Sequence, residues 1–337
     1  MQSSRFASRL RHALRSNGFA RNRSSSRPRA LSPLLGITLK LVSALAFTLM
    51  SAAIKSISTR YPTGEIVFIR SFFAMIPLLL WLAWRSELPA ALKTSNLRGH
   101  LKRGIMGSTG MFCGFAALQF LPLSEAVAIG YAAPLAVVVL AALVLKERVR
   151  IYRWSAVTIG FVGVLIMLSP HLGAGSHPVG GNAALGAALG LAGAFCSAFA
   201  SVEVRLLTQT ERTGAIVFYF MLLTSLLGLS TILLGWNMPD LKDALLMLVI
   251  GILGGLGQIL IVQAYRYGDA SLIAPFEYST MLWAVAIGWF WFGEWPAAAI
   301  LVGAFIVVTS GIYVILRERQ LGLARREQRE VGPSRMT

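Results

Sequence analysis

The stretch Asp269–Glu294, DASLIAPFEYSTMLWAVAIGWFWFGE, is long enough to cross a bilayer, yet it carries the carboxylate of Glu277 inside its apolar run. A carboxylate at that depth is costly unless it is paired or lines a water-filled cavity. An earlier stretch, Pro122–Glu147, PLSEAVAIGYAAPLAVVVLAALVLKE, aligns with it at an offset of 147 residues, which places Tyr131 on Tyr278. A glycine takes the place of Glu277 in the earlier stretch. The pair predicts a duplicated membrane scaffold to which a few polar residues were added in one copy.

The composition supports a membrane protein. Of 337 residues, 56% are hydrophobic and only 13% are charged, and the mean hydropathy is +0.68. A soluble chain of this length would need more charge to cover its surface. Because lipid-exposed backbone must satisfy its own hydrogen bonds and alternating short strands are absent, the apolar runs predict helices. Ten runs reach the necessary length: 34–56, 64–84, 101–120, 123–145, 152–169, 183–202, 214–235, 244–264, 270–292 and 296–315.

The net charge of +17 follows the topology. Of the 31 Lys and Arg residues, 26 fall in the two tails and in alternate loops, whereas the opposite loops hold only Arg60 and Lys242. Cytoplasmic loops carry such an excess of basic residues, so both termini are predicted to be cytoplasmic. The basic excess is therefore a topology signal and not the footprint of a nucleic-acid-binding protein.

Internal matches divide the chain into two repeats. The run Thr63–Phe68 matches Thr213–Phe218 at an offset of 150, and three glycines of 104–110 match three of 251–257 at an offset of 147. The predicted units are 33–170 and 183–316, each of five spans, flanked by a basic arm (1–32) and a tail (317–337). The arm is interpreted as cytoplasmic and lipid-touching, with an organellar targeting segment as the alternative.

Five spans per repeat is an odd number, so the second repeat must cross the membrane in the opposite sense. The charges agree: the corner after span four holds Lys146, Arg148, Arg150 and Arg153, and the matching corner after span nine has no basic residue. Inverted-topology repeats carry alternating access in many secondary transporters. The fold class predicted is an all-α membrane protein of ten transmembrane helices in two inverted five-helix repeats.

Several motifs resemble the EamA-type drug/metabolite transporters. They are Arg70 in the second span, the run from Ala117 through Pro134 to Glu147, Gly160–Gly163, the corner Phe292-Gly293-Glu294, and Gly303–Gly311. The likeness covers about residues 33–316. The segment APFEYSTMLWAVAIGWFWFGEWP is most similar to bacterial members that import riboflavin or S-adenosylmethionine, and is also similar to exporters of amino acids and metallophores. Met281 stands where the first repeat has Pro134, so a symmetric proline kink is not expected.

Three charges lie deep in the predicted spans: Lys40, Arg70 and Glu277. Their repeat-mates are all neutral, as expected for residues that contact an asymmetric substrate. The alternative is a structural ion pair of Glu277 with Lys40 or Arg70, since breaking a buried pair costs about 3–5 kcal/mol. Lys40 could also extend its stem to the membrane face. Glu277 is the deep group that could carry a coupling proton, because no histidine lies inside a span.

Polar and aromatic residues near these charges complete the predicted substrate cavity. They are Tyr131, Tyr278, Thr280, Trp283, Gln258 and Gln263. Aromatic rings with a few polar groups would suit a flat heteroaromatic ligand, and helix packing or lipid contact is the alternative for each ring. No catalytic residue, cofactor or metal site is predicted, and Cys113 and Cys196 are interpreted as packing residues.

The predicted function is secondary transport of a small polar organic metabolite across the bacterial inner membrane. The resemblance favours riboflavin uptake first, then S-adenosylmethionine uptake or export of amino acids and related metabolites. A membrane-embedded transferase is a distant alternative, because the loops lack clusters of acids or histidines. The predicted partners are a small-molecule substrate and the lipid bilayer; a homodimer is left open.

Overall fold

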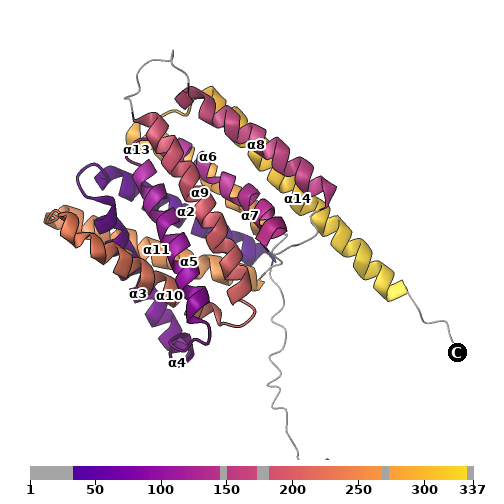
Figure 1. The fold of residues 1–337 in the computed structure, drawn as a ribbon, viewed down its shortest axis with the longest axis horizontal. Helices are drawn as coiled ribbons and strands as arrows, with labels where there is room; N and C mark the ends of the chain where they lie inside the picture. Colours follow the sequence, from indigo (N-terminus) through magenta and orange to yellow (C-terminus); the bar gives the residue numbers. More distant parts are fainter. Residues whose placement is uncertain (1–32, 145–149, 173–181, 268–272, 332–337) are drawn as a thin grey trace, which may run out of the picture. The chain divides into compact units, whose positions relative to one another are not determined.

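The computed structural model describes residues 33–144, 150–172, 182–267 and 273–331. Every regular element in these ranges is helical (Figure 1), which satisfies the backbone hydrogen bonds inside each span. The basic arm and the Lys146–Arg148 corner of the sequence prediction lie outside the described residues.

The first repeat contains seven helical segments. They are α2 (Pro33–Ile57), α3 (Thr63–Trp84), α4 (Leu88–Ala91), α5 (Leu97–Ala117), α6 (Leu123–Gly130), α7 (Ala132–Val144) and α8 (Ile151–Leu172). The start of α5 is fixed by Asn96, whose side chain accepts a hydrogen bond from the Gly99 amide at 3.0 Å.

The second repeat follows the same order. Its elements are α9 (Ala183–Leu207), α10 (Thr213–Ser230), η1 (Thr231–Leu234), α11 (Leu241–Tyr267), η2 (Ala274–Tyr278), α13 (Ser279–Phe292) and α14 (Ala298–Val331). Gly293, with φ of +67°, ends α13 in the left-handed conformation that glycine adopts most readily. The last helix runs on past the predicted tenth span into the predicted tail.

Eight spans of the described chain are long and apolar enough to cross a membrane, with α6 and α7 together making one of them. The two remaining predicted spans correspond to α5 and to η2 with α13. Four basic residues lower the hydropathy of α5: Arg98, His100, Lys102 and Arg103. A short 3-10 segment interrupts the other. The prediction of an all-helical membrane fold of ten spans is confirmed.

Helix packing follows the inverted duplication. The first helix of each repeat packs along the third long helix of the other, so α2 lies beside α11 and α5 beside α9 (Figure 1). At the α5–α9 crossing, a Cβ on Gly110 would lie 3.1 Å from the carbonyl oxygen of Gly193. Such close approach between spans requires small residues, so the glycine at this crossing has a packing role. The final helices of the two repeats, α8 and α14, run side by side.

The helix bundle has two ends of different composition. The basic end holds the starts of α2 and α5 and the α9–α10 turn; the far end holds the α2–α3 and α5–α6 turns and the start of α11.

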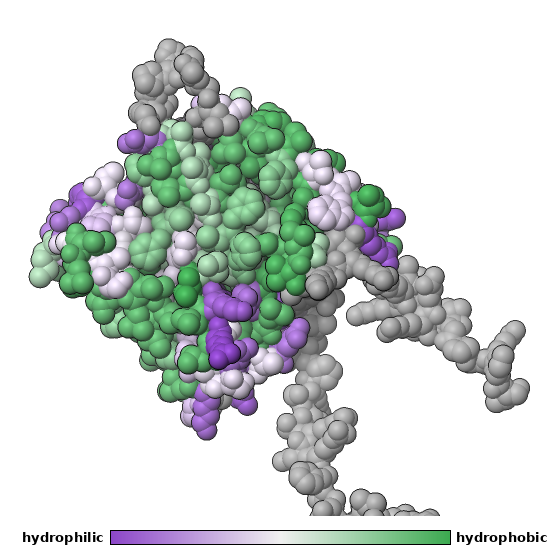
Figure 2. Space-filling model, viewed as in Figure 1, coloured by the Kyte–Doolittle hydropathy of each residue, from purple (hydrophilic) through white to green (hydrophobic). Residues whose placement is uncertain are grey.

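On the face drawn in Figure 2, hydrophobic residues cover most of the surface, and hydrophilic ones gather mainly toward its margins and lower part. Large apolar side chains stay exposed along the spans, as in Phe290 and Phe305. This surface suits contact with lipid tails.

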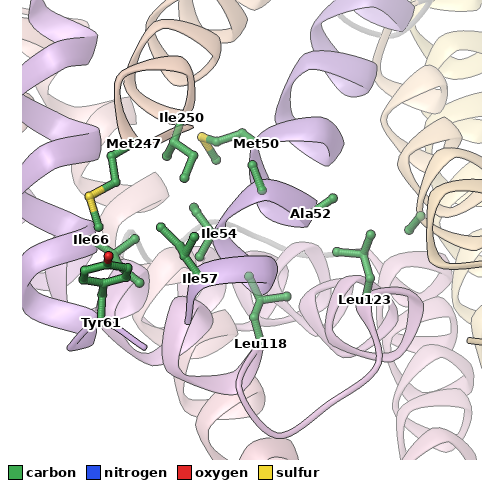
Figure 3. Packing of buried hydrophobic residues seen from close by; sticks show 12 residues of the cluster. Met50, Ala52, Ile54, Ile57, Tyr61, Ile66, Leu118, Leu123, Met247 and Ile250 are labelled. Atoms are coloured by element: carbon green, nitrogen blue, oxygen red, sulfur yellow. The ribbon is translucent and has the colours of Figure 1, made fainter. Parts of the chain in front are cut away.

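A hydrophobic core fills the far end. Figure 3 shows Ile54 and Ile57 of α2 beside Met247 and Ile250 of α11. Ile54 and Ile57 are fully buried. The complete cluster also contains Met50, Ala52, Ala53, Tyr61, Ile66, Leu118, Leu123 and Ala284. Inside a bilayer such contacts hold helices together through close packing, because lipid tails are as apolar as the side chains.

Glu211, in the α9–α10 turn, joins the second repeat to the start of α5. Its Oε1 atom accepts hydrogen bonds from the Thr94 hydroxyl at 2.9 Å, the Ser95 amide at 2.8 Å and the Asn96 amide at 2.9 Å. Burial alone would raise the pKa of Glu211, but these hydrogen bonds outweigh it and the pKa lies below its ordinary value. The folded state therefore favours the charged carboxylate.

The matching junction lies at the far end. There the Tyr61 hydroxyl, in the α2–α3 turn, donates to Asp243 at 2.8 Å, and Arg60 Nη1 lies 2.7 Å from the same carboxylate oxygen. The hydrogen bond to Asp243, together with burial, raises the pKa of Tyr61. Tyr61 is the repeat-mate of Glu211 at the offset of 150 residues, and Asp243 is that of Asn96 at the offset of 147. The duplication thus reproduces one inter-repeat contact at both ends of the bundle.

Glu211→Gln should lower the free energy of unfolding at neutral pH, because an amide accepts weaker hydrogen bonds than a carboxylate. A depressed folded-state pKa contributes stability above the unfolded value, about 4.3, and loses it as pH falls through the folded value. The difference in Tm between wild type and variant should therefore shrink on acidification below about pH 4. Thermal unfolding in detergent at stepped pH measures it. Glu87→Gln is the control, since within the described part of the chain Glu87 pairs only with nearby Arg85; a pH-independent difference would contradict the assignment.

Candidate functional site

Spans four and nine are both interrupted, and the interruptions meet. The first lies at Tyr131, between α6 and α7, and the second at η2, which ends at Tyr278. The two tyrosine rings, repeat-mates, are 5.2 Å apart in an edge-to-face arrangement. The Tyr131 hydroxyl lies 2.6 Å from the Thr280 hydroxyl and donates to the Tyr278 carbonyl at 3.3 Å. Interrupted helices of this kind form the midplane sites of many transporters.

The prolines of the two interrupted spans lie at different places relative to the breaks. Pro134 lies one turn after Tyr131, whereas the second repeat has Pro275 within η2 itself. The Thr280 hydroxyl donates to the Glu277 carbonyl at 2.8 Å, which satisfies one backbone acceptor in the irregular turn. The two spans are therefore interrupted at equivalent places by different local means.

Glu277 is paired with Lys40 of α2. Lys40 Nζ donates to Glu277 Oε2, and the pair joins the first span to the ninth near the basic end. The environment of the two groups is unequal, since the Lys40 side chain is 1% exposed and that of Glu277 is 45% exposed. The sequence left open a structural ion pair of Glu277 with either Lys40 or Arg70. The pair observed is the one with Lys40.

Arg70 lines a separate cavity of about 330 Å³. The residue is 3% exposed, and its Nε and Nη1 atoms have no hydrogen-bond acceptor among the described residues. Leaving buried donors unsatisfied costs about 1–3 kcal/mol each, and more when the group is charged. A guanidinium kept in this state is suited to receive an acceptor from a ligand.

The cavity runs from the middle of the bundle toward the basic end, between α3, α5, α9 and α10, with contributions from α2 and α11. Its lining has no acidic residue among the described side chains. The residues are Met50, Arg70, Arg103, Gly107, Gly110, Met111, Gly114, Phe115, Ser197, Ala200, Ser201, Val204, Phe220 and Gln258. Met50 also belongs to the far-end core, so that core closes the cavity on one side.

Arg103 is a functional candidate that the sequence does not single out, because a basic residue this close to the end of a span reads as part of the positive-inside signal. Its guanidinium carbon lies 3.6 Å from the centre of the Phe220 ring, a cation–π contact, and it lines the same cavity as Arg70. A usable signal was present: Arg103 shares a helix face with Gly107, Gly110 and Gly114 at spacings of four, three and four residues.

Four of the remaining predicted residues lie in the cavity or at the junction of the interrupted spans, and two lie in neither. Gln258 lines the cavity with Arg70, whereas Tyr131, Tyr278 and Thr280 belong to the junction of the interrupted spans. Gln263 does not line the cavity. Trp283 on α13 has a buried Nε1 with no acceptor among the described residues, and it also lies outside the cavity lining.

Lys55 forms a second ion pair between α2 and span nine, at the far end. Its Nζ lies 3.0 Å from Glu294 Oε1 and donates to the Leu121 carbonyl at 2.6 Å. Glu294 Oε2 in turn accepts from the Leu123 amide at 3.1 Å. This node ties α2, the α5–α6 turn and the α13–α14 corner together, so α2 is fastened to span nine at both of its ends.

No group of three or more His, Cys, Asp or Glu residues in the described ranges is placed to hold a metal ion. The cavity itself offers hydrogen-bond donors, the cations Arg70 and Arg103, and the aromatic faces of Phe115 and Phe220. These are groups that bind a polar organic molecule.

Comparison with known proteins assigns the chain to a family. The chain matches the EamA-like transporter family twice, over residues 34–169 and 184–317. It is 30% identical over 279 residues to the pseudopaline exporter CntI of Pseudomonas aeruginosa (strain UCBPP-PA14), covering 82% of this chain and 94% of that protein.

Two further relatives are named as transporters of other compounds. Identity is 27% over 289 residues to the S-adenosylmethionine uptake transporter of Rickettsia prowazekii, covering 85% of this chain and 94% of the relative. It is also 27%, over 286 residues, to the riboflavin transporter of Vibrio cholerae, with coverages of 84% and 93%. A solved structure described as "Crystal structure of protein" superposes with a TM-score of 0.58 at 20% identity, covering 86% of this chain and 97% of that one; this likeness concerns the fold alone.

The two matched segments coincide with the two five-span repeats. The chain is a multi-pass membrane protein that belongs to the EamA-like transporter family of secondary transporters, and it is not an enzyme.

Proposed function

We propose that this protein moves a small carboxylate-bearing organic metabolite across the bacterial inner membrane by alternating access. The observation that carries the proposal is the buried guanidinium of Arg70, which faces a cavity of about 330 Å³ with unsatisfied donors. Arginine recognises carboxylates through charge-assisted hydrogen bonds, often in pairs. The volume is at the lower end of the range for small-molecule sites.

This chemistry changes the order of the substrates expected from the sequence. S-adenosylmethionine and amino acids carry an ionised carboxylate, whereas riboflavin is uncharged at neutral pH. Carboxylate-bearing substrates are therefore favoured over riboflavin. Riboflavin remains the second candidate, because Phe115 and Phe220 line the cavity and could stack against a flat ring.

The orientation proposed has both termini in the cytoplasm, with the basic end of the bundle facing inward. The positive-inside distribution of Lys and Arg supports this. In that orientation the cavity reaches toward the cytoplasm and the far-end core separates it from the outside. Cysteine labelling at exposed positions in the α2–α3 turn and in the 93–96 loop would establish the sidedness.

The test is transport by the purified protein in liposomes. We expect saturable counterflow of at least one radiolabelled carboxylate, chosen from metabolites whose cellular level changes when the gene is deleted. The decarboxylated analogue of the same compound should not compete. Saturable riboflavin counterflow without any carboxylate transport would favour the second candidate, and ohmic conductance would point to a channel.

Glu277 is proposed to carry the coupling proton. The titratable groups around it are Lys40 of α2 and the hydroxyls of Tyr131 and Tyr278. Replacing Glu277 alone would strand the buried Lys40, so the double variant Lys40→Met/Glu277→Gln removes both charges. We expect uptake by wild type to vary with pH between acid and neutral values, and uptake by the double variant to be constant. A variant with an unchanged pH profile would remove Glu277 from this role.

A further inference from the structure

Two guanidinium groups face the cavity, and each has donors without a partner. Nε and Nη1 are buried and lack a hydrogen-bond acceptor in the described chain in both Arg70 and Arg103. Neither residue belongs to an ion pair there. The cavity therefore presents two cations and no acidic side chain among its described lining residues.

The two groups enter the cavity from different helices and at different depths. Arg70 comes from α3 near the middle of the bundle, whereas Arg103 is seven residues into α5 from the basic end. Small residues separate them along α5, since Gly107, Gly110 and Gly114 all line the space. An elongated molecule could therefore lie along the glycine face with one end at each guanidinium.

Phe220 holds Arg103 in place. The ring lies under the guanidinium at 3.6 Å, so it occupies a face of the group while the nitrogen donors at the periphery stay available. Phe220 is also the repeat-mate of Arg70 at the offset of 150 residues. The same position of the repeat is thus the cation Arg70 in the first copy. In the second copy it is the aromatic ring that contacts Arg103.

We propose that the substrate carries two ionised acid groups, one bound by Arg70 and one by Arg103. The substrate class is a small di-acid, such as a dicarboxylic amino acid. This inference rests on the proposed function and narrows it, because a single arginine would suffice for a monocarboxylate. Arg103 is the residue that distinguishes di-acids from mono-acids of the same size.

The test compares di-acids with their half-amides, which have nearly the same shape and one charge less. L-Aspartate, L-glutamate and L-2-aminoadipate are titrated against L-asparagine, L-glutamine and the half-amide of L-2-aminoadipate, with thermal stabilisation of the detergent-solubilised protein as the readout. We expect at least one di-acid to bind wild type about tenfold more tightly than its half-amide, as for the loss of one charge-assisted hydrogen bond. Arg103→Gln should abolish the preference, and Phe220→Leu should reduce it.

Lys102→Gln is the matched control, since it removes an exposed charge from the neighbouring position. It should leave the preference unchanged. Size-exclusion profiles and ligand-free Tm values show whether each variant is folded. A wild-type protein without preference for any di-acid overturns the inference, as does a preference that persists in Arg103→Gln.

The outcome separates this inference from the function on which it rests. Arg70-dependent binding of monocarboxylates, with no advantage for di-acids, would overturn the di-acid assignment and leave carboxylate transport standing. Absence of binding and counterflow for every carboxylate would overturn both.

Discussion

Arg70→Gln is expected to lower the affinity for the substrate by about 30-fold to 5,000-fold, with little or no loss of folding stability. Removing one partner of a buried charged contact costs about 2–5 kcal/mol of binding, which corresponds to this range. The ligand-free fold should tolerate the change, because Arg70 has two donors without a partner among the described residues. Counterflow in liposomes and thermal unfolding of the same preparations measure the two effects together.

Arg70→Lys is the informative companion. A lysine keeps the charge but loses the planar pair of donors, so it should restore part of the affinity and not all of it. A variant that loses transport because it unfolds would instead show a lower Tm without ligand. Unchanged half-saturation in a folded Arg70→Gln protein would exclude Arg70 from the binding site.

The Lys40–Glu277 pair should respond unequally to removal of its two members. Glu277→Gln leaves the almost fully buried ammonium of Lys40 without its counter-ion, and breaking such a pair costs about 3–5 kcal/mol. Lys40→Met leaves a carboxylate that is nearly half exposed, so its cost should be clearly smaller. Thermal and denaturant unfolding of the two single variants gives the comparison.

The double variant Lys40→Met/Glu277→Gln closes the thermodynamic cycle. It should be more stable than Glu277→Gln alone, because no charge is left stranded. If the effects of the two substitutions simply added, the two groups would not interact energetically. Equal losses in the two single variants would contradict the unequal burial of the pair.

The architecture was accessible from the sequence because each of its determinants is a pattern repeated over many residues. Ten apolar runs, the alternation of basic loops and two sets of matched positions all indicate the same inverted fold. The alignment makes Tyr131 and Tyr278 equivalent without predicting a contact between them, and the structure places their rings 5.2 Å apart.

The partners of individual charges were not accessible in this way. Lys40 and Glu277 lie at similar depths from the basic end, whereas Arg70 enters its span from the far end. Depth therefore favours Lys40 as the partner of Glu277 but does not establish the contact. Helix rotation decides the outcome: α2 packs against η2 and α13 and brings Lys40 to Glu277, whereas α3 packs against α10 and α11 and directs Arg70 into the cavity. A hydropathy profile contains no information about such rotations.

Arg103 was missed for a related reason. Near a membrane face, the sequence around a basic residue in a loop is similar to that around one at the start of a span. Only the residue at the start of a span can reach a cavity. The glycines that follow Arg103 on one face of α5 distinguish the two cases, because side chains that small leave room for a guanidinium to fold inward.

Both cavity arginines belong to the first repeat, and their counterparts in the second are Phe220 and Ile250, which are apolar. The inward-open and outward-open forms of the carrier are consequently not mirror images. Substrate arriving from either compartment meets a different surface, so half-saturation concentrations measured from the two faces should be unequal. Microscopic reversibility then requires maximal velocities to differ in the same ratio when no ion is coupled. The carrier is thus asymmetric in its kinetics, and this asymmetry by itself leaves the equilibrium distribution of its solute unchanged.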